Sequence, residues 1–275
     1  MNICIAGKNL IAIKVTEYLL NKLLFSKDNL MIIPNKDDSG VNNWQPSFKK
    51  YATDNEIKIV QLELTYKIDN LIFLSLEFDI IIKPSLFKSK NLFNIHFSLL
   101  PKYRGVYTSI YPILNGEKFS GVTLHLIDKG IDTGDIIEQL SFRIGNNHTS
   151  RDLYHRYLKY GIKLMNKNLI KILNGNYKTF SQNHLDSSYY RRDSINFKKI
   201  EINLNKTSVE IFNQIRAFIF PEYQLPKLRN NFIYKTILYK NKIGLNQFIE
   251  KEELIILSGN DGYKIEAYKE KESIN

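Results

Sequence analysis

Short runs of branched apolar residues alternate with helix-like segments through the first hundred residues of this chain. The runs at residues 2–6, 29–33, 57–62 and 79–83 have the composition of buried strands, and apolar residues recur at helical spacing over residues 10–25. Three consecutive isoleucines in the fourth run are typical of a strand that is buried on both faces. Strands that alternate with helices pair in parallel through right-handed crossovers. The sequence therefore predicts an α/β fold with a Rossmann-like, mostly parallel sheet flanked by helices.

The last part of the chain has a different pattern. Short strand-like segments follow one another at residues 232–239, 254–257 and 263–268, and a Gly-Asn-Asp-Gly turn precedes the last of them. We expect a small C-terminal β subdomain with too little sequence to bury its amphipathic strands, so we predict that it packs against a second subunit in a homodimer. The expected boundaries are 1–185 for the α/β domain, 186–230 for a linker and helix, and 231–275 for the β subdomain.

Basic residues outnumber acidic ones by 39 to 28, which gives the 275-residue chain a net charge of +11. This charge favours an acidic partner such as a phosphate ester, a nucleotide or a nucleic acid. A bias of the chain toward Lys, Asn and Ile explains the charge equally well. Four lysines also recur every four residues in a helix predicted over residues 150–175; they could contact RNA, but such a stripe is more often a solvated helix face. They are Lys159, Lys163, Lys167 and Lys171.

Missing patterns exclude several classes of protein. No segment approaches the ~18 apolar residues of a membrane helix, and the first residues do not resemble a signal peptide. The single cysteine, Cys4, cannot form an intramolecular disulfide, which fits a reducing cytoplasm. Without a Gly-x-Gly-x-x-Gly motif we expect no nicotinamide cofactor. His148, His155 and His184 show no metal-ligand spacing, so we predict no metal site.

Residues 94–135 carry the side chains best suited to chemistry. Asn94 and His96 lie two residues apart in a predicted strand, so both side chains point to the same face. Asp132 follows in a loop whose glycines permit a tight turn, and its carboxylate could approach His96 closely. An amide, an imidazole and a carboxylate at two strand ends can serve acyl transfer. We interpret another histidine, His125, as structural or as a support for this group.

This stretch resembles the catalytic segment of the formyltransferases that depend on 10-formyltetrahydrofolate. The resemblance rests on the Asn-x-His pair, a Ser-Leu-Leu-Pro loop that ends in Arg-Gly, a Gly-Val-Thr strand and a final Asp-Thr-Gly-Asp. It is strong over residues 75–140 and looser on either side. It implies that Asn94, His96 and Asp132 are catalytic.

The resemblance also implies a co-substrate, N10-formyltetrahydrofolate, bound in a pocket near the carboxyl end of the fourth strand. Lys83 and Pro84 end that predicted strand, and Asp135 follows the catalytic loop. Lys83 could meet an anionic group of the folate, although a surface lysine is the commoner explanation. Asp135 could contact the pterin or support the loop. In the implied reaction an amine attacks the formyl carbon, Asn94 and His96 donate hydrogen bonds to the oxyanion, and Asp132 orients His96 and assists proton removal.

Two branches of the family differ in their acceptor. The branch that acts on methionyl-tRNA has small residues after the Arg-Gly and a larger C-terminal β-barrel. Here Val106 and Tyr107 follow Gly105, and the C-terminal part is short. Both features resemble the branch that formylates dTDP-linked amino sugars, and we expect a 3-amino-3,6-dideoxyhexose. Methionyl-tRNA formyltransferase is the alternative, and a nucleic-acid-binding protein on a degenerate fold is a second. The sequence does not choose between an amine on C3 and one on C4, or the stereochemistry of the sugar.

Aromatic residues outside this stretch are candidates for contacting the acceptor. Trp44, the only tryptophan, could stack on a base or sugar or could close an edge of the core. Ser47 could cap a short helix and place N–H groups near a phosphate. Phe220 and Tyr223 lie at the end of a helix predicted over residues 207–220, where they could stack on a base or pack on the core. Tyr107, in the segment after the Arg-Gly, is a further candidate for binding the acceptor.

Overall fold

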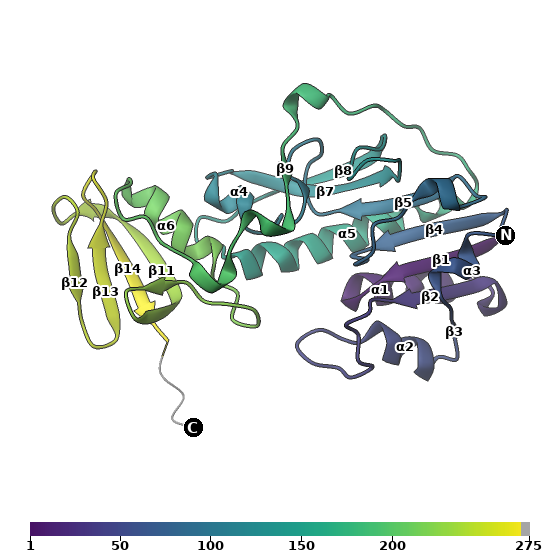
Figure 1. Ribbon diagram of the computed structural model, residues 1–275, viewed down its shortest axis with the longest axis horizontal. Coiled ribbons are helices and arrows are strands. Elements are labelled where there is room, and N and C mark those ends of the chain that lie inside the picture. The colour runs from purple at the N-terminus through teal and green to yellow at the C-terminus, as the bar shows by residue number, and fades with distance from the viewer. Residues whose placement is uncertain (271–275) are drawn as a thin grey trace. The chain divides into compact units, whose positions relative to one another are not determined.

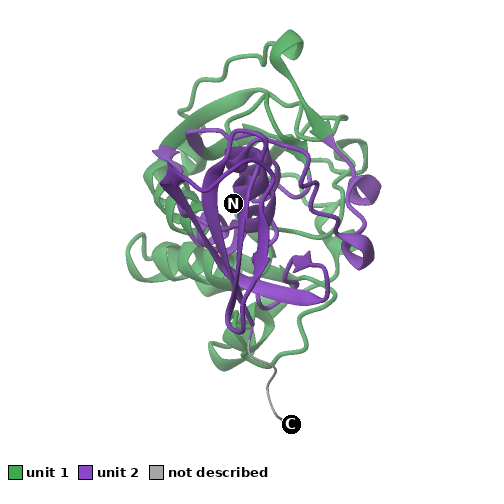
Figure 2. Ribbon diagram, turned by 90° about the vertical axis from the view of Figure 1, so that its left-hand side faces the viewer, with its two compact units in different colours: residues 1–105, 121–141, 156–189 green, residues 106–120, 142–155, 190–275 purple. Residues whose placement is uncertain are grey.

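The computed structural model describes residues 1–270, which form two compact units (Figure 1). Unit 1 consists of residues 1–105, 121–141 and 156–189 (Figure 2, green). Unit 2 consists of residues 106–120, 142–155 and, within the described part of the chain, 190–270 (Figure 2, purple). Each unit is therefore built from segments that lie far apart in the sequence.

Unit 1 is organised around a seven-stranded sheet. Its neighbouring strands pair in parallel as far as the fifth, which pairs antiparallel with the sixth. This arrangement confirms the mostly parallel sheet predicted from the sequence. In spatial order the strands are β3 (Lys58–Ile59), β2 (Leu30–Pro34), β1 (Asn2–Gly7), β4 (Leu71–Leu76), β5 (Asn91–His96), β7 (Phe119–Leu126) and β8 (Ile136–Arg143).

Two long helices of unit 1 meet the sheet at a glycine. A Cβ added to Gly161 would lie 2.8 Å from Ile11 and 3.4 Å from both Ile95 and Phe97, so α5 packs closely on α1 and on the end of β5. A second apolar cluster, which includes Cys4, Phe73 and Phe87, packs beside the same strands. The helices of unit 1 are α1 (Asn9–Asn21), α2 (Phe48–Asp54), α3 (Leu62–Thr65) and most of α5 (Ser150–Leu173).

Two of the predicted strands are wrong in their extent or place. Residues 79–83 form no strand, and Ile81 in their middle is 67% exposed. The strand between β1 and β5 is instead β4, which ends before residue 79, and all six of its residues are buried. The predicted strand at 57–62 shrinks to the two residues of β3, and α3 begins at Leu62. Lys83 and Pro84 therefore lie in the loop that follows β4, not in a strand.

Unit 2 contains an antiparallel five-stranded sheet covered by one helix, α6 (Ser208–Ala217). Thr207 and Glu210 form a capping box at the start of this helix. The strands predicted at the end of the chain are confirmed as far as residue 270; the last five residues of the expected subdomain lie outside the described part. In spatial order the strands are β10 (Lys227–Leu228), β11 (Asn231–Lys242), β14 (Tyr263–Lys269), β13 (Leu254–Ser258) and β12 (Phe248–Glu250).

Short elements complete the chain. Among residues 1–270 no helix is both long enough and apolar enough to cross a membrane. A two-stranded sheet joins β6 (Arg104–Gly105) to β9 (Tyr189–Tyr190), and α4 (Tyr111–Leu114) is a single helical turn. The 3-10 helices are η1 (Lys27–Asn29), η2 (Pro84–Leu86), η3 (His184–Asp186), η4 (Arg192–Ser194) and η5 (Phe197–Lys199).

Candidate active site

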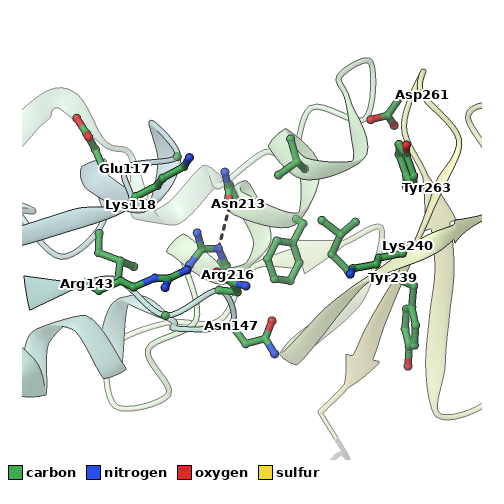
Figure 3. A pocket seen from close by; sticks show the side chains of 17 residues that line it. Glu117, Lys118, Arg143, Asn147, Asn213, Arg216, Tyr239, Lys240, Asp261 and Tyr263 are labelled. Carbon is green, nitrogen blue, oxygen red and sulfur yellow. Dashed lines mark hydrogen bonds between the residues drawn. The ribbon is translucent and has the colours of Figure 1, made fainter.

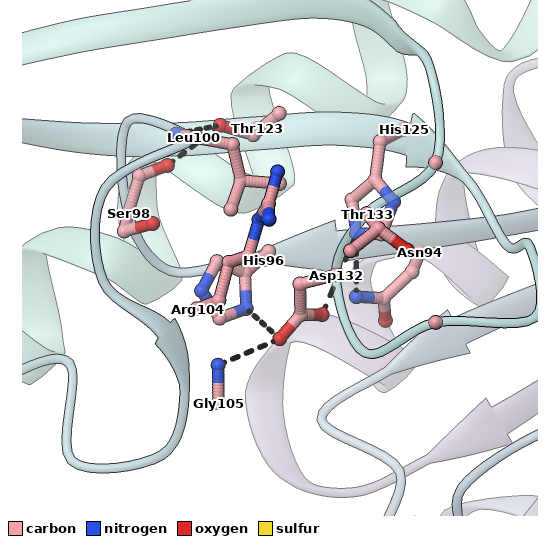
Figure 4. A network of polar contacts seen from close by, with 12 residues as sticks. Asn94, His96, Ser98, Leu100, Arg104, Gly105, Thr123, His125, Asp132 and Thr133 are labelled. Atoms are coloured by element: carbon pink, nitrogen blue, oxygen red, sulfur yellow. Dashed lines mark hydrogen bonds and ion pairs between the residues drawn. The ribbon is translucent and has the colours of Figure 1, made fainter. Parts of the chain in front are cut away.

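Asn94, His96 and Asp132 come together in unit 1 (Figure 4). The first two extend from β5 with one residue between them, and the loop after β7 brings Asp132 to the same place. Oδ2 of Asp132 lies 3.5 Å from Nδ1 of His96, and Oδ1 lies 3.7 Å from Nε2 of His125. The carboxylate is therefore between two imidazole rings.

The ring of His96 is held from two sides. The residue is 7% exposed, and Nε2 lies 2.7 Å from the carbonyl oxygen of Tyr103. Because a carbonyl only accepts, Nε2 carries a hydrogen and donates it. Nδ1 then faces the carboxylate of Asp132, which suits a ring that gains a proton at Nδ1 during a reaction.

His125 contacts the group more closely than the sequence indicated. It lies directly opposite Asn94 in the antiparallel pairing of β7 with β5, and its Nε2 is 3.0 Å from Nδ2 of Asn94. Nδ1 lies 2.7 Å from the carbonyl oxygen of Leu126. A neutral ring with its hydrogen on Nδ1 satisfies both contacts: it donates to Leu126 and accepts from the amide of Asn94. Burial lowers the pKa of His125 to about 4, and the nearby Asp132 opposes this change.

Backbone contacts fix the position of Asp132. The N–H group of Gly105 donates to Oδ2 at 2.9 Å. The side chain of Gln182 donates to the carbonyl oxygens of Asp132 and Gly134 at 3.0 and 2.7 Å. A Cβ added to Gly134 would lie 1.8 Å from the carbonyl oxygen of Leu126, so only glycine lets the loop approach β7 this closely.

Gln182 is a support that sequence reasoning missed. Its side-chain oxygen accepts from Nη2 of the buried Arg104 at 2.6 Å, and Arg104 also lies 3.0 Å from Nδ1 of His184. Burial lowers the pKa of the Arg104 guanidinium, and the carboxylate of Asp132 opposes that change. Arg104, Gln182 and the Asp132 loop therefore form one polar network.

The residues expected to hold the folate lie in loops of unit 1. Lys83 is exposed and Pro84 opens η2, both in the segment that follows the carboxyl end of β4. Ligands bind outside the carboxyl ends of parallel strands, and β5 ends at His96 on the same edge. Asp135 is half-buried, and its carbonyl oxygen accepts from the N–H group of Leu126 at 2.9 Å. The segment after β4 therefore remains a reasonable place for a folate, although it is not a strand.

Ser47 caps a short helix, as expected, but an acid of the chain already occupies that position. Its side chain accepts from the N–H group of Lys50 at the start of α2. Its hydroxyl donates to Asp38 at 2.5 Å, and the N–H group of Lys49 donates to the same carboxylate at 2.9 Å. The carboxylate of Asp38 thus takes the position expected for a phosphate, which argues against an anion there. Trp44 nearby is half-buried rather than exposed.

The other acceptor candidates lie in unit 2. The hydroxyl of Tyr107 donates to the carbonyl oxygen of Arg192 at 2.8 Å, and its ring contacts Phe197 edge-on. Phe220 is only 4% exposed, whereas Tyr223 is 58% exposed. Their ring centres are 4.8 Å apart. Phe220 is therefore placed as a core residue, and Tyr223 has the exposure that a ligand contact needs.

The fold and this cluster define an α/β protein with a site suited to acyl transfer. Residues 59–169 match the family model described as formyl transferase. A solved sugar 3N-formyltransferase, WlaRD, crystallised with dTDP and 5-N-formyl-THF, is 55% identical with a TM-score of 0.95, and the match covers 98% of this chain and 97% of that one. An N-formyltransferase from Helicobacter canadensis, solved with folinic acid and dTDP-3-aminofucose, is 54% identical with a TM-score of 0.96, over 98% of this chain and 100% of that one. The chain belongs to the formyltransferase family.

Curated relatives match over a shorter length. The methionyl-tRNA formyltransferase of Alkaliphilus oremlandii is 31% identical over 180 residues, which are 63% of this chain and 57% of that protein. The chain thus spans about half the length of the methionyl-tRNA formyltransferases that it matches.

Proposed function

We propose that this protein transfers the formyl group of N10-formyltetrahydrofolate to the amine of a dTDP-linked 3-amino-3,6-dideoxyhexose. The observation that carries the proposal is the end-to-end match, at 54–55% identity, to two sugar N-formyltransferases. One of these was crystallised with dTDP and a formyl folate, and the other with dTDP-3-aminofucose. Methionyl-tRNA formyltransferases match over only about half of their length, which makes a tRNA acceptor the weaker alternative.

The geometry supports a division of roles among the three residues. One hydrogen of the Asn94 amide is directed at Nε2 of His125, which leaves the second hydrogen for the formyl oxygen. As the amine attacks the formyl carbon, that oxygen becomes an oxyanion, which Asn94 stabilises by a hydrogen bond. A protonated His96 stabilises it by charge and not by the hydrogen bond expected from the sequence, because its two ring nitrogens face Tyr103 and Asp132. Asp132, 3.5 Å from Nδ1 of His96, stabilises the charged ring and relays the proton lost by the amine. The bond from the formyl carbon to the folate nitrogen then breaks, that nitrogen takes up a proton, and tetrahydrofolate leaves.

Nucleic-acid binding on a degenerate fold is the less well supported function. Two of the four lysines along α5 are engaged within the chain: Lys167 forms an ion pair with Glu138, and Lys171 lies 3.9 Å from the same carboxylate. A stripe that is half occupied by its own acid is a poor contact surface for phosphates. RNA affinity that falls steeply with salt would instead favour this function.

An acceptor panel tests the proposal. Purified protein is incubated with formyl folate and dTDP-3-amino, dTDP-4-amino or methionyl-tRNA acceptors, and formylated products are identified by mass spectrometry. We expect turnover of a 3-amino sugar and none of methionyl-tRNA. Turnover of the tRNA alone, or of the 4-amino sugars alone, would overturn the assignment.

We also propose a cytoplasmic location. Cys4 is fully buried in β1, and burial raises the pKa of its thiol. A lone thiol in the reduced form is typical of proteins in a reducing compartment. Fractionation of cells that produce the protein tests this point.

A further inference from the structure

Unit 2 contains a cavity of about 720 Å³ (Figure 3). Its lining includes none of the candidate catalytic, folate-binding or acceptor-binding residues. It is bounded by the segment before β7, the loop after β8, one side of α6 and part of β11. Pockets that bind small molecules measure about 300–1,000 Å³. The cavity is thus large enough for a nucleotide.

Arg216 is the unusual residue of this cavity. It is only 6% exposed, and its hydrogen-bond partners are neutral: Nε donates to Asn213 at 2.9 Å, and Nη1 donates to the carbonyl oxygen of His148 at 2.7 Å. No carboxylate among residues 1–270 forms an ion pair with it. Burial lowers the pKa of Arg216 to about 10, so the guanidinium still carries its charge near neutral pH.

Other half-buried cations of unit 2 have acidic partners. Arg151 lies 2.7 Å from Glu222, and Lys264 lies 2.6 Å from Glu266. A buried charge without such a partner is costly unless an opposite charge joins it. An anion entering the cavity would therefore stabilise Arg216, whose contacts with Asn213, His148 and the Phe212 ring carry no negative charge.

Further cations line the same cavity. Lys118, Arg143 and Lys240 are exposed, and none of the three pairs with a carboxylate of the described chain. In Figure 3 the side chain of Arg143 extends toward that of Arg216. Two acids, Glu117 and Asp261, also belong to the lining. The carboxylate of Asp261 is already bound by the N–H group and hydroxyl of Ser208, at 2.9 and 2.6 Å.

Aromatic rings form another part of the lining. In Figure 3, Tyr239 and Tyr263 lie across the cavity from Arg143. Each has a lysine over its ring: Lys264 is 4.7 Å from the centre of Tyr239, and Lys242 is 4.9 Å from that of Tyr263. Tyrosine rings present apolar faces on which a base can stack. The two guanidinium groups on one side and the two rings on the other match a ligand with phosphates at one end and a base at the other.

We propose that this cavity is a binding site for a nucleoside diphosphate, separate from the cluster of Asn94, His96 and Asp132. The diphosphate lies between Arg143 and Arg216, and the base lies against the tyrosines. Charge-assisted hydrogen bonds to a phosphate suit the planar, multiply donating guanidinium of arginine. This site does not depend on which acceptor the protein formylates.

Calorimetric titration of dTDP into the whole protein tests the proposal. The informative variants are Arg143→Glu and Lys240→Glu, because both residues are exposed and reversal of their charge leaves the core unchanged. Lys159→Glu, at an exposed position of α5, is the matched control with the same change in net charge. We expect the wild type and the control to bind one more dTDP per chain than either cavity variant, or to bind it at least tenfold more tightly at that site. Identical titrations in all four proteins would overturn the site.

Two further measurements separate the parts of the proposal. Inorganic pyrophosphate should compete with dTDP for the site lost in Arg143→Glu, and failure to compete would show that the cations do not hold the diphosphate. Tyr263→Ala should weaken dTDP but leave pyrophosphate unchanged, and an unchanged dTDP affinity would reject the placement of the base. Formylation assays on the same variants are read separately, so a failure of the proposed reaction leaves the binding result intact.

Discussion

The amide nitrogen of Asn94 lies 3.0 Å from Nε2 of His125, on the strand directly opposite. An asparagine amide can rotate by half a turn and exchange its donor for its acceptor. An acceptor at Nε2 holds the NH2 group toward His125 and so fixes which end of the amide can face a substrate. His125 is therefore a positioning residue for Asn94.

Removal of this acceptor should lower kcat. We expect His125→Leu to reduce kcat by about tenfold, the upper range for one lost hydrogen bond, with little change in KM. His125→Gln should recover part of the loss, because its side-chain oxygen can accept from the same amide. Steady-state kinetics on both folded variants provides the measurement. Equal kcat in the leucine and glutamine variants would show that the ring only fills space.

The buried ring also predicts a dependence of stability on pH. The pKa of His125 is about 4 in the folded protein and 6.5 in the reference state. Between these values the unfolded chain binds the proton and the folded chain does not. The contribution of the neutral His125 ring to the free energy of unfolding is therefore fully present above pH 6.5 and is lost as the pH falls toward about 4. The free energy of unfolding, measured with urea, should fall less between about pH 7 and about pH 4 for His125→Gln than for the wild type. The difference between the two falls should be at most about 3 kcal/mol. Parallel curves for the wild type and the variant would refute the assignment.

The carboxylate and imidazole of the site should act as a unit. Asp132→Asn preserves the shape of the side chain but removes the charge beside His96, and His96→Asn removes the imidazole. Each should lower kcat by about 100-fold or more, the effect of losing one transition-state contact, while binding of both substrates changes little. The double variant should be little slower than the slower single one. Additive losses, or near-normal kcat in either folded single variant, would contradict the mechanism.

Exposure divides the aromatic candidates for the acceptor. Trp44→Ala and Tyr223→Ala should weaken acceptor binding more than folate binding, since both side chains have accessible surface. Phe220→Ala is the contrast: its ring is buried, so the main effect should be a loss of unfolding free energy of about 3–5 kcal/mol. Calorimetry with each substrate and thermal melts separate the two effects. Unchanged acceptor affinity in the first two variants would remove them from the acceptor site.

We predict that the protein forms a homodimer through the outer face of β11. On β11 the side chains of Phe232 and Tyr234 are 46% and 44% exposed, while Ile233 between them faces α6 in the core. We expect this outer face to pack against a second copy, so light scattering should give a dimer mass at micromolar concentration. Tyr234→Glu should shift the mass toward that of a monomer. A monomer mass for the unaltered protein would rule out the homodimer.

Local sequence patterns predicted where strands and helices could form, but not always which of two neighbouring candidates forms the strand. Residues 71–83 contain two apolar runs, and only one can lie between β1 and β5. The run with three isoleucines has the composition more typical of a buried strand, yet the strand is formed by Leu71–Leu76. Asp79, at the start of the isoleucine run, instead accepts a hydrogen bond from the N–H group of Lys36. Which run enters a parallel sheet depends on long-range pairing and crossover length, which composition does not encode.

The site likewise contains residues that the sequence predicted and residues that it did not. The motif spacing indicated Asn94, His96 and Asp132 as a group, and the structure brings them together. Gln182 comes from a distant segment that has no motif, and it acts through hydrogen bonds to backbone carbonyls. Every residue type has a backbone carbonyl, so the sequence does not reveal which residues will accept such hydrogen bonds. The capping serine, Ser47, was found from its position, but its partner Asp38 was not, because loop geometry decides that contact.

Asp132 adopts a backbone φ of +53°, in the left-handed region that glycine occupies freely and that other residues, even the more tolerant asparagine and aspartate, occupy only with strain. The network of Gly105, Gln182 and the close turn at Gly134 holds it there. A conformation of this kind costs about 1–3 kcal/mol and persists only where its surroundings impose it. Selection for thermal tolerance alone would therefore accept glycine or asparagine at this position, and selection for turnover would reject both. Heat resistance and catalysis are thus opposed at this single residue, and a library screened separately for each should diverge there first.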